Sequence, residues 1–328
     1  MYSFFIGIDV SKDHFDAAYV LFGKVFYLGR FKNSQEGFIS LLCELKQVAN
    51  YKLDKWFFCF ENTGVYSETL FFWLHENGIA FKAENPIQIH RSLGLKRGKN
   101  DKADAQAIAL YCFEKRDSLQ ATKPAKPIVY KLKKLVLRRD FLVKQRTAVL
   151  TSFKMQRQTL DEDLMNIFEE QTQELVLTFN KQIKEIERKI KQVKSQDIYL
   201  NKNDELVRSV VGIGHVISTF MLAYTENFER ITEPKKLASF IGIAPFENSS
   251  GKFVGKTKIS YLANKKIKSL LSNAAYSAIN YDPQIAKYYE RKIKEGKPQS
   301  AVINAVKNKL VQRIYAVVKR QTPYVKLN

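Results

Sequence analysis

The sequence predicts an α/β sheet domain at its N-terminal end, then a long helical region and a mostly α-helical C-terminal domain. Short apolar runs at 3–10 and 56–60 alternate with stretches of helical spacing, and this alternation is typical of a sheet with helical crossovers. Apolar residues recur in steps of three and four over 176–193, which indicates a long helix. The expected domains are 1–122, 123–198 and 199–328.

The N-terminal elements follow from local patterns. Residues 3–10 form an aromatic and β-branched run that stops at Ser11 and Lys12, so they predict a buried strand. Residues 34–48 carry Phe38 and three leucines at helical spacing. By the same criteria we expect further strands at 14–20, 25–31, 56–60 and 79–83, and further helices at 66–77 and 101–115.

The middle region begins after Pro124 and Pro127. Its heptad seam comprises Val176, Phe179, Ile183, Ile186, Ile190 and Val193. Such a seam fits either one long helix packed on its own domain or a coiled coil, which would imply oligomerisation. Residues 196–204 break the pattern. The remainder is predicted to be mostly helical, with a polar Gly/Ser loop at 247–256.

The charge is strongly positive. The 328 residues hold 54 Lys and Arg against 33 Asp and Glu, a net charge of +21. Residues 123–158 carry eleven basic residues and one acid, and residues 251–328 carry seventeen basic residues and three acids. Two separate basic blocks favour a long phosphate backbone as the partner over a merely solvated surface. Within the first block we expect Arg138 and Arg139 to contact nucleic acid.

Other classes are disfavoured. No apolar run is long enough to span a membrane, and the first residues lack the pattern of a signal peptide. Three widely spaced cysteines and four histidines form neither a disulfide framework nor a zinc site. We therefore expect a reducing, cytoplasmic setting.

Four acids stand where metal chemistry is expected. Asp9 ends one buried strand and Glu61 follows another, so both emerge at one sheet edge if the strands share a sheet. Asp101 and Asp104 are three residues apart and share a helix face. By themselves these two fit an acidic helix start that suits the helix dipole. Together with Asp9 and Glu61 they predict a site for Mg²⁺ or Mn²⁺.

Two further motifs lie in the C-terminal part. Val211-Gly212-Ile213-Gly214 between helical stretches is typical of the hairpin of helix-hairpin-helix modules, where backbone amides contact phosphates. His215 is expected to cap or pack. The loop around Ser250 is either a surface turn or the position of a serine nucleophile, and Lys252, Lys256 and Lys258 follow it.

These motifs, in this order and spacing, resemble the DEDD transposases of bacterial insertion sequences, relatives of the Piv and MooV DNA invertases. The resemblance spans about residues 4–322 and rests on five segments: Gly7–Lys12, Glu61–Tyr66, Asn100–Ala105, Val211–Gly214 and Ser249–Gly251. Asn62 and Asn100 depart from the usual residues without touching an expected ligand.

The resemblance implies a RuvC-like, RNase H-type N-terminal domain whose metal-binding tetrad is Asp9, Glu61, Asp101 and Asp104. It also implies a coiled-coil middle and a C-terminal domain whose serine attacks DNA. That serine is Ser250, with Ser249 as the alternative. Lys252, Lys256 and Lys258 would bind the phosphate, and Gly212 and Gly214 the nucleic-acid backbone.

The resemblance further implies a bridge-RNA-guided recombinase of a bacterial cell, associated with the nucleoid. In such a recombinase a structured guide RNA pairs with target and donor DNA. The protein would act as a homo-oligomer, a dimer or a tetramer, with one subunit's tetrad meeting another's serine.

The main alternative is a Holliday-junction-type nuclease that uses the metal site and water alone. A decayed, non-catalytic binder is disfavoured by the intact tetrad, and a sugar kinase or ATPase by the missing phosphate-loop glycines.

Overall fold

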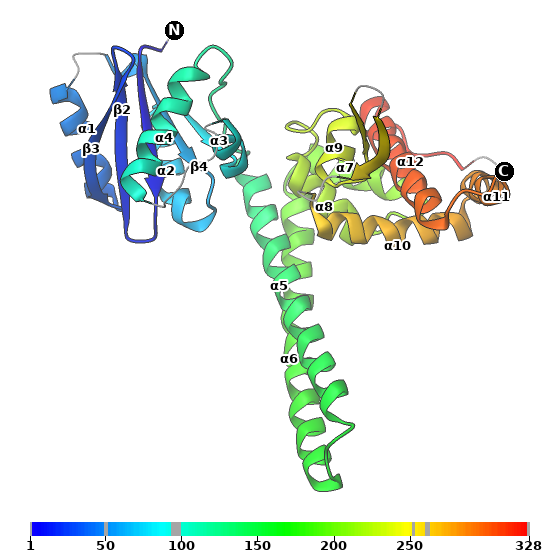
Figure 1. Cartoon of the computed structure of the whole chain (residues 1–328). Coiled ribbons are helices and arrows are strands. Elements are labelled where there is room, and N and C mark those ends of the chain that lie inside the picture. The colour runs from blue at the N-terminus through cyan, green and yellow to red at the C-terminus, as the bar shows by residue number, and fades with distance from the viewer. Residues whose placement is uncertain (1, 49–51, 93–99, 251–252, 260–262, 327–328) are drawn as a thin grey trace. The chain divides into compact units, whose positions relative to one another are not determined.

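The computed structural model describes residues 2–48, 52–92, 100–250, 253–259 and 263–326, and it divides into two compact units (Figure 1). The first unit is Met1–Pro124 and the second is Ala125–Asn328. The long helices that the sequence analysis sets apart as a middle region thus belong to the same unit as the C-terminal helices. No helix in the described ranges is both long and apolar enough to cross a membrane.

The first unit is built on a five-stranded mixed sheet with the order β3-β2-β1-β4-β5. The first three strands form an antiparallel meander, while β4 and β5 continue parallel to β1. This order and polarity is that of the RNase H-like fold, so the predicted fold class is confirmed. The strands are β1 (Phe4–Val10), β2 (His14–Leu21), β3 (Lys24–Lys32), β4 (Trp56–Glu61) and β5 (Phe81–Glu84).

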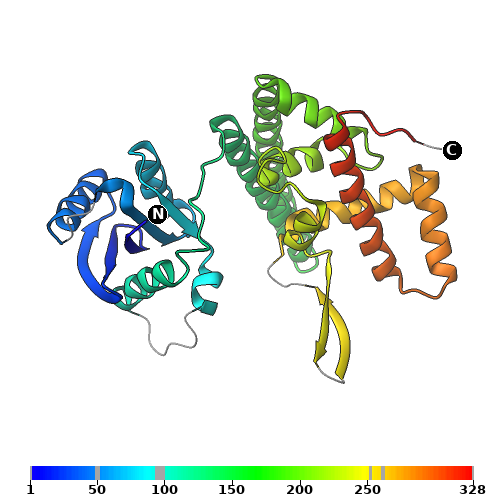
Figure 2. The ribbon, with the colours of Figure 1, turned by 90° about the horizontal axis from the view of Figure 1, so that it is seen from above.

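Helices cover both faces of this sheet (Figure 2). Side chains alternate along β1, so Phe4, Ile6 and Ile8 pack against helices α1 and α2, whereas Phe5 points to the face of helices α3 and α4. Burial on both faces explains why β1 and β4 are continuous apolar runs. The helical elements of the unit are α1 (Gln35–Val48), η1 (Leu53–Lys55), α2 (Val65–Glu76), α3 (Pro86–Ser92) and α4 (Asp101–Glu114).

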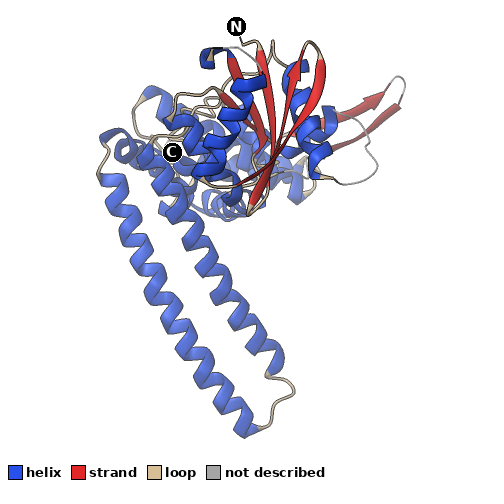
Figure 3. Ribbon diagram, turned by 90° about the vertical axis from the view of Figure 1, so that its left-hand side faces the viewer, coloured by secondary structure: helices blue, strands red, loops and turns tan. Residues whose placement is uncertain are grey.

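The second unit begins with two long helices, α5 (Pro127–Gln156) and α6 (Glu162–Ser195), which lie side by side as an antiparallel hairpin (Figure 3). At the base of the hairpin, Ile190 and Val193 of the predicted heptad seam are buried in one core with Leu132 and Val136 of α5. This part of the seam is therefore covered within the chain. Towards the tip, Leu175 and Leu177 are exposed.

The rest of the second unit is a helical bundle with one β-hairpin. Its core is formed mainly by apolar side chains of α8, α10 and α12. The elements are α7 (Ile198–Ser209), α8 (His215–Thr225), α9 (Pro234–Phe240), β6 (Pro245–Ser250), β7 (Phe253–Ile259), α10 (Lys265–Tyr281), α11 (Pro283–Lys294) and α12 (Gln299–Arg320).

The predicted polar loop at 247–256 is wrong, because β6 and β7 pair there as an antiparallel hairpin. Polar and basic residues hide the strand pattern, yet Thr257 and Ile259 alternate with Lys256 and Lys258 at the period of a strand. Helix α3, a short helix of seven residues, is also not among the predicted elements.

Close packing of β1 on α4 gives a first prediction. A Cβ atom on Gly7 would lie 2.1 Å from the backbone nitrogen of Ala109 and 2.6 Å from the carbonyl oxygen of Ala105. Because both obstacles are backbone atoms, we expect Gly7→Ala to lower the free energy of unfolding by about 3 kcal/mol. Urea unfolding of the variant measures this loss.

Gly29→Ala is the matched control, because it also adds a methyl group to a strand glycine. Its Cβ would meet only the Phe31 ring, at 3.6 Å, an ordinary contact. Equal stability of the two variants would contradict the close β1–α4 packing.

Candidate active site

Three acids lie side by side across the sheet. In the parallel register of β1 and β4, Ile8 is paired with Phe60, so Asp9 and Glu61 follow at neighbouring positions. In the antiparallel register of β1 and β2, Asp9 is paired with Asp16. Alternation along each strand puts all three acids on the sheet face that α4 covers, the face of Phe5 and Ala18.

Helix α4 adds two more acids. The side chain of Asn100 caps the helix by accepting a hydrogen bond from the backbone N–H of Lys102, at 3.1 Å. This cap starts the helix at Asp101, so Asp101 and Asp104 both lie in its first turn. The small residues Ala105 and Ala109 then pack α4 against Gly7 of β1, two residues before Asp9.

The pKa of Asp9 shows that the acids converge. It is raised from its usual 3.8 to about 6, first by burial and then by the negative charges of Asp104, Glu61, Asp101 and Asp16, in that order. The structure thus brings the four acids selected from the sequence into one electrostatic cluster. It adds Asp16, which the sequence analysis does not select.

Asp16 is held by a network that also reaches the predicted tetrad. Its carboxylate is buried and accepts hydrogen bonds from the Tyr27 hydroxyl at 2.6 Å and from Nε of Arg30 at 3.0 Å. Nη2 of Arg30 also donates to Oδ2 of Asp101 at 2.7 Å. Arg30 therefore links a buried acid of β2 to the first turn of α4 and offsets part of their negative charge.

Asp16 and Arg30 are the residues that sequence reasoning misses here. The available signal is an acid inside an otherwise apolar strand, in the run Phe15-Asp16-Ala17-Ala18. Its partner Arg30 is fourteen residues away and becomes adjacent only through the register of β2 and β3. Across the sheet, Nε2 of His90 in α3 lies 3.6 Å from Glu61.

The donor set fits a hard divalent cation. Carboxylate oxygens are the ligands that Mg²⁺ and Mn²⁺ prefer, and a cation would offset the repulsion that raises the pKa of Asp9. Within the described ranges, no three His, Cys, Asp or Glu residues are grouped closely enough to hold an ion as they stand. One Asp101 oxygen is bound by Arg30, so metal binding would require these side chains to adjust.

The serine and lysine candidates lie on or near the β-hairpin of the second unit. Ser250 is the last residue of β6 and is paired with Phe253 of β7, and Ser249 is paired with Val254. Lys256 and Lys258 are on β7. Lys252 lies outside the described residues.

The two predicted glycines have different environments. Gly212 has a φ of +89° and a Cβ there would lie 2.5 Å from the carbonyl oxygen of Ala274, so conformation and packing against α10 both require glycine. Gly214 is the N-cap of α8, and a Cβ there would meet no atom within 4 Å. Of the two, Gly214 has the open surroundings that a backbone contact needs.

The two arginines of α5 also differ. Arg138 is exposed and lies over the ring of Phe141. Arg139 is largely buried and donates to Glu187 of α6 from Nε at 2.8 Å and approaches it from Nη2 at 2.7 Å. Arg139 is thus engaged in joining the two long helices, whereas Arg138 is accessible to a partner.

Known proteins resemble this chain over almost its whole length. A DEDD transposase model of the IS110 type matches residues 6–165, and the model of the transposase IS116/IS110/IS902 family matches residues 204–290. The pilin gene-inverting protein of Moraxella lacunata is 28% identical over 98% of each chain. The transposase for insertion sequence element IS1111A of Coxiella burnetii is 23% identical over 97% of this chain and 90% of its own.

A solved structure, T. thermophilus RuvC in complex with Holliday junction substrate, aligns with 37% of this chain and 99% of its own. The two sequences are 19% identical there, and the TM-score is 0.27.

The raised pKa of Asp9 gives a second prediction. The folded protein holds the Asp9 proton up to about pH 6 and the unfolded chain only to about 3.8, so this group lowers stability as pH rises through that window. At pH 7.5 in EDTA, Asp9→Asn should have a free energy of unfolding about 1 kcal/mol higher than wild type, after allowance for screening by water. The variant should therefore unfold at a higher temperature. At pH 4 the two proteins should unfold alike.

The same pair of proteins tests the metal. Added Mg²⁺ or Mn²⁺ should raise the unfolding temperature of wild type at pH 7.5, because the ion binds the folded form. The rise should be much smaller in Asp9→Asn. An equal rise in both proteins would exclude Asp9 as a ligand.

The Asp16–Arg30 pair gives a third prediction. Arg30→Met leaves a buried carboxylate with one cation fewer, so we expect a loss of about 2 kcal/mol in the free energy of unfolding. The double variant Asp16→Asn/Arg30→Met should lose less than the two single changes added together, as measured by urea unfolding.

Arg116→Met is the control for this cycle. Arg116 is exposed, lies over the Phe113 ring and donates to the Phe113 carbonyl oxygen, so its removal should cost well under 1 kcal/mol. Strict additivity in the cycle would show that Arg30 does not stabilise Asp16.

Proposed function

Since this chain belongs to the DEDD transposases of the IS116/IS110/IS902 family, we propose that it acts on bacterial insertion-sequence DNA, which it cuts and rejoins as a transposase or recombinase. The observation that carries the proposal is the cluster of Asp9, Glu61, Asp101 and Asp104. The negative charges of Glu61, Asp101 and Asp104 raise the pKa of Asp9, within the unit that the DEDD transposase model covers. A binding protein without catalysis has no need to gather this much negative charge where a phosphate must approach.

In this proposal the four acids hold one or two divalent cations, Mg²⁺ or Mn²⁺. When bound, such ions polarise a phosphodiester and stabilise charge on its oxygens. The remaining residues set the geometry. Arg30 keeps Asp101 beside β2 through Asp16, and the Asn100 cap fixes where α4 begins. The raised pKa of Asp9 favours activity at neutral or alkaline pH, where its carboxylate is ionised.

Ser250 is the proposed nucleophile. Its hydroxyl oxygen would form a bond to the scissile phosphorus, lose its proton to solvent and displace the 3′-oxygen, which takes up a proton. The product is a 5′-phosphoserine link and a free 3′-hydroxyl. Attack by a partner strand's 3′-hydroxyl would then reverse this chemistry and restore the serine, so one difficult transfer becomes two similar ones. Lys256 and Lys258 on β7, with Lys252, supply positive charge along the same segment.

Partners follow from charge and exposed surface. A net charge of +21 in two blocks suits target and donor DNA together with a structured guide RNA. Exposed Arg138 on α5 and open Gly214 at the start of α8 are the proposed backbone contacts. Leu175 and Leu177, exposed towards the tip of the long hairpin, support assembly of the chain into a dimer or tetramer.

The test places the gene between its native flanks in cells and scores the circular excision junction by PCR. We expect wild type to give the junction and Asp9→Asn and Ser250→Ala to lose it. Ser249→Ala is the matched control, one residue away on the same strand, and should keep it. A denaturing gel of cleavage reactions should show a covalent protein–DNA adduct that Ser250→Ala lacks.

The second candidate is a nuclease that uses the acids and water alone. It is favoured if Asp9→Asn abolishes cleavage while Ser250→Ala and Ser249→Ala both cut DNA without an adduct. Loss of the junction in Ser249→Ala alone would move the nucleophile to Ser249.

A further inference from the structure

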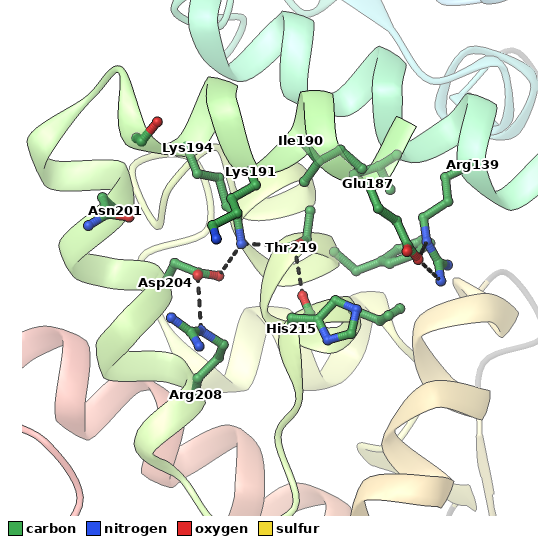
Figure 4. A pocket seen from close by; sticks show the side chains of 14 residues that line it. Arg139, Glu187, Ile190, Lys191, Lys194, Asn201, Asp204, Arg208, His215 and Thr219 are labelled. Carbon is green, nitrogen blue, oxygen red and sulfur yellow. Dashed lines mark hydrogen bonds and ion pairs between the residues drawn. The ribbon is translucent and has the colours of Figure 1, made fainter. Parts of the chain in front are cut away.

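A pocket of about 270 Å³ lies in the second unit where α5, α6, α7 and α8 meet (Figure 4). It adjoins the start of α8, directly after the Gly212–Gly214 turn, because His215 and Val216 line it. Among the described residues, its lining comes from these four helices of the second unit.

The polar side of the pocket carries more positive than negative charge. Oδ1 of Asp204 accepts from Nζ of Lys194 at 2.8 Å and from the Ser218 hydroxyl at 2.8 Å, and Oδ2 accepts from Nε of Arg208 at 3.0 Å. One carboxylate thus serves two cations. The side chains of Lys194 and Asp204 are only 9% and 5% exposed, so water screens the surplus charge weakly.

Further groups add to this surplus. Lys191 lines the pocket and is exposed, one helical turn before Lys194. The N-terminal end of α8, which begins at His215, contributes the positive end of its dipole. The remaining cation, Arg139, is neutralised by Glu187. The lining therefore carries an excess of two positive charges on the side of Lys191, Lys194 and Arg208.

The other side of the pocket is apolar. It is formed by Val136 of α5, Ile190 of α6, and Val216 and Phe220 of α8. A small anion such as free phosphate would occupy only the charged side of the pocket and leave the apolar wall exposed to water. A ligand with a phosphate at one end and a flat, weakly polar ring at the other satisfies both sides.

We propose that this pocket binds one nucleotide, with its phosphate against Lys191, Lys194 and Arg208 and its base against Ile190 and Phe220. The volume corresponds to about nine water molecules at ~30 Å³ each, which suits one nucleotide and excludes a base pair. A nucleotide within a strand must then leave the base stack to enter. The proposal rests on the proposed function in that it assigns a site to the nucleic acid that the enzyme handles.

The test uses the full chain and two fluorescent probes. One is a 12-nucleotide single strand with a central 2-aminopurine, made as DNA and as RNA, and the other is free 2-aminopurine riboside 5′-monophosphate. Fluorescence of 2-aminopurine rises when the base leaves a stack and changes when it enters a protein pocket. We expect a saturable change with a strand, and affinity about tenfold weaker in Lys191→Gln/Arg208→Gln because two phosphate-facing charges are lost.

The matched control is Lys189→Gln/Arg230→Gln, which removes the same two charges elsewhere in the unit. Lys189 lies on α6 and pairs with Glu185 four residues earlier, and Arg230 pairs with Glu226 as Arg208 pairs with Asp204. Neither control residue lines the pocket. If Arg208→Gln disturbs folding, the single variants Lys191→Gln and Lys189→Gln can be compared instead. Each removes one exposed lysine, in the pocket and outside it respectively.

The outcomes separate the alternatives. A change with a strand that the pocket variant weakens and the control keeps supports the site. The same pattern with the free monophosphate identifies a free nucleotide as the source. Equal weakening in both variants, or strand binding by anisotropy without any 2-aminopurine change, overturns the inference and leaves the proposed function standing. If wild type binds no strand at all, the proposed function fails as well.

Discussion

The contact between Gly7 and α4 is the constraint on which the acid cluster depends. Asp9 and Glu61 would be neighbours in any sheet with this register, but Asp101 and Asp104 reach them only because α4 lies directly on β1. That approach needs glycine at position 7, because a Cβ there would meet the backbone of Ala105 and Ala109. Because backbone atoms of β1 and α4 are in direct contact, the helix cannot slide along the strand. The start of α4 is therefore fixed relative to the end of β1.

Gathering five acids at one place is electrostatically costly, and the structure limits the cost in three ways. Arg30 bridges Asp16 and Asp101, the Tyr27 hydroxyl binds Asp16, and Asp9 shifts its pKa to about 6. Such destabilising arrangements are typical of sites shaped for a bound ion and a charged substrate. The second unit shows the opposite sign. In its pocket one carboxylate, Asp204, pairs with two cations, Lys194 and Arg208.

The two signs suit the two tasks of a DNA-rejoining enzyme. Metal-dependent phosphoryl transfer needs concentrated carboxylates, and holding nucleic acid needs surplus cations. Here the cluster of carboxylates lies in Met1–Pro124, and both the long basic helix α5 and the lysines of β7 lie in Ala125–Asn328. The basic blocks are visible as composition, but which arginine is accessible is not. Arg138 is exposed and its neighbour Arg139 is bound to Glu187, because successive residues face different sides of a helix.

Local pattern and composition are sufficient to predict the strands of the first unit, most helices, the four acids of the cluster and the two basic blocks. The continuous apolar runs at 3–10 and 56–60 place Asp9 and Glu61 at the ends of buried strands. Features that depend on strand register and side-chain packing become visible only in the folded chain. Asp16 and Arg30 join the cluster through strand pairing. At the base of the long hairpin, the heptad seam of α6 packs against α5 of the same chain. Residues 245–259 pair as a β-hairpin. The pocket between α5 and α8 likewise exists only once four helices meet, since no segment of the sequence contains more than part of its wall.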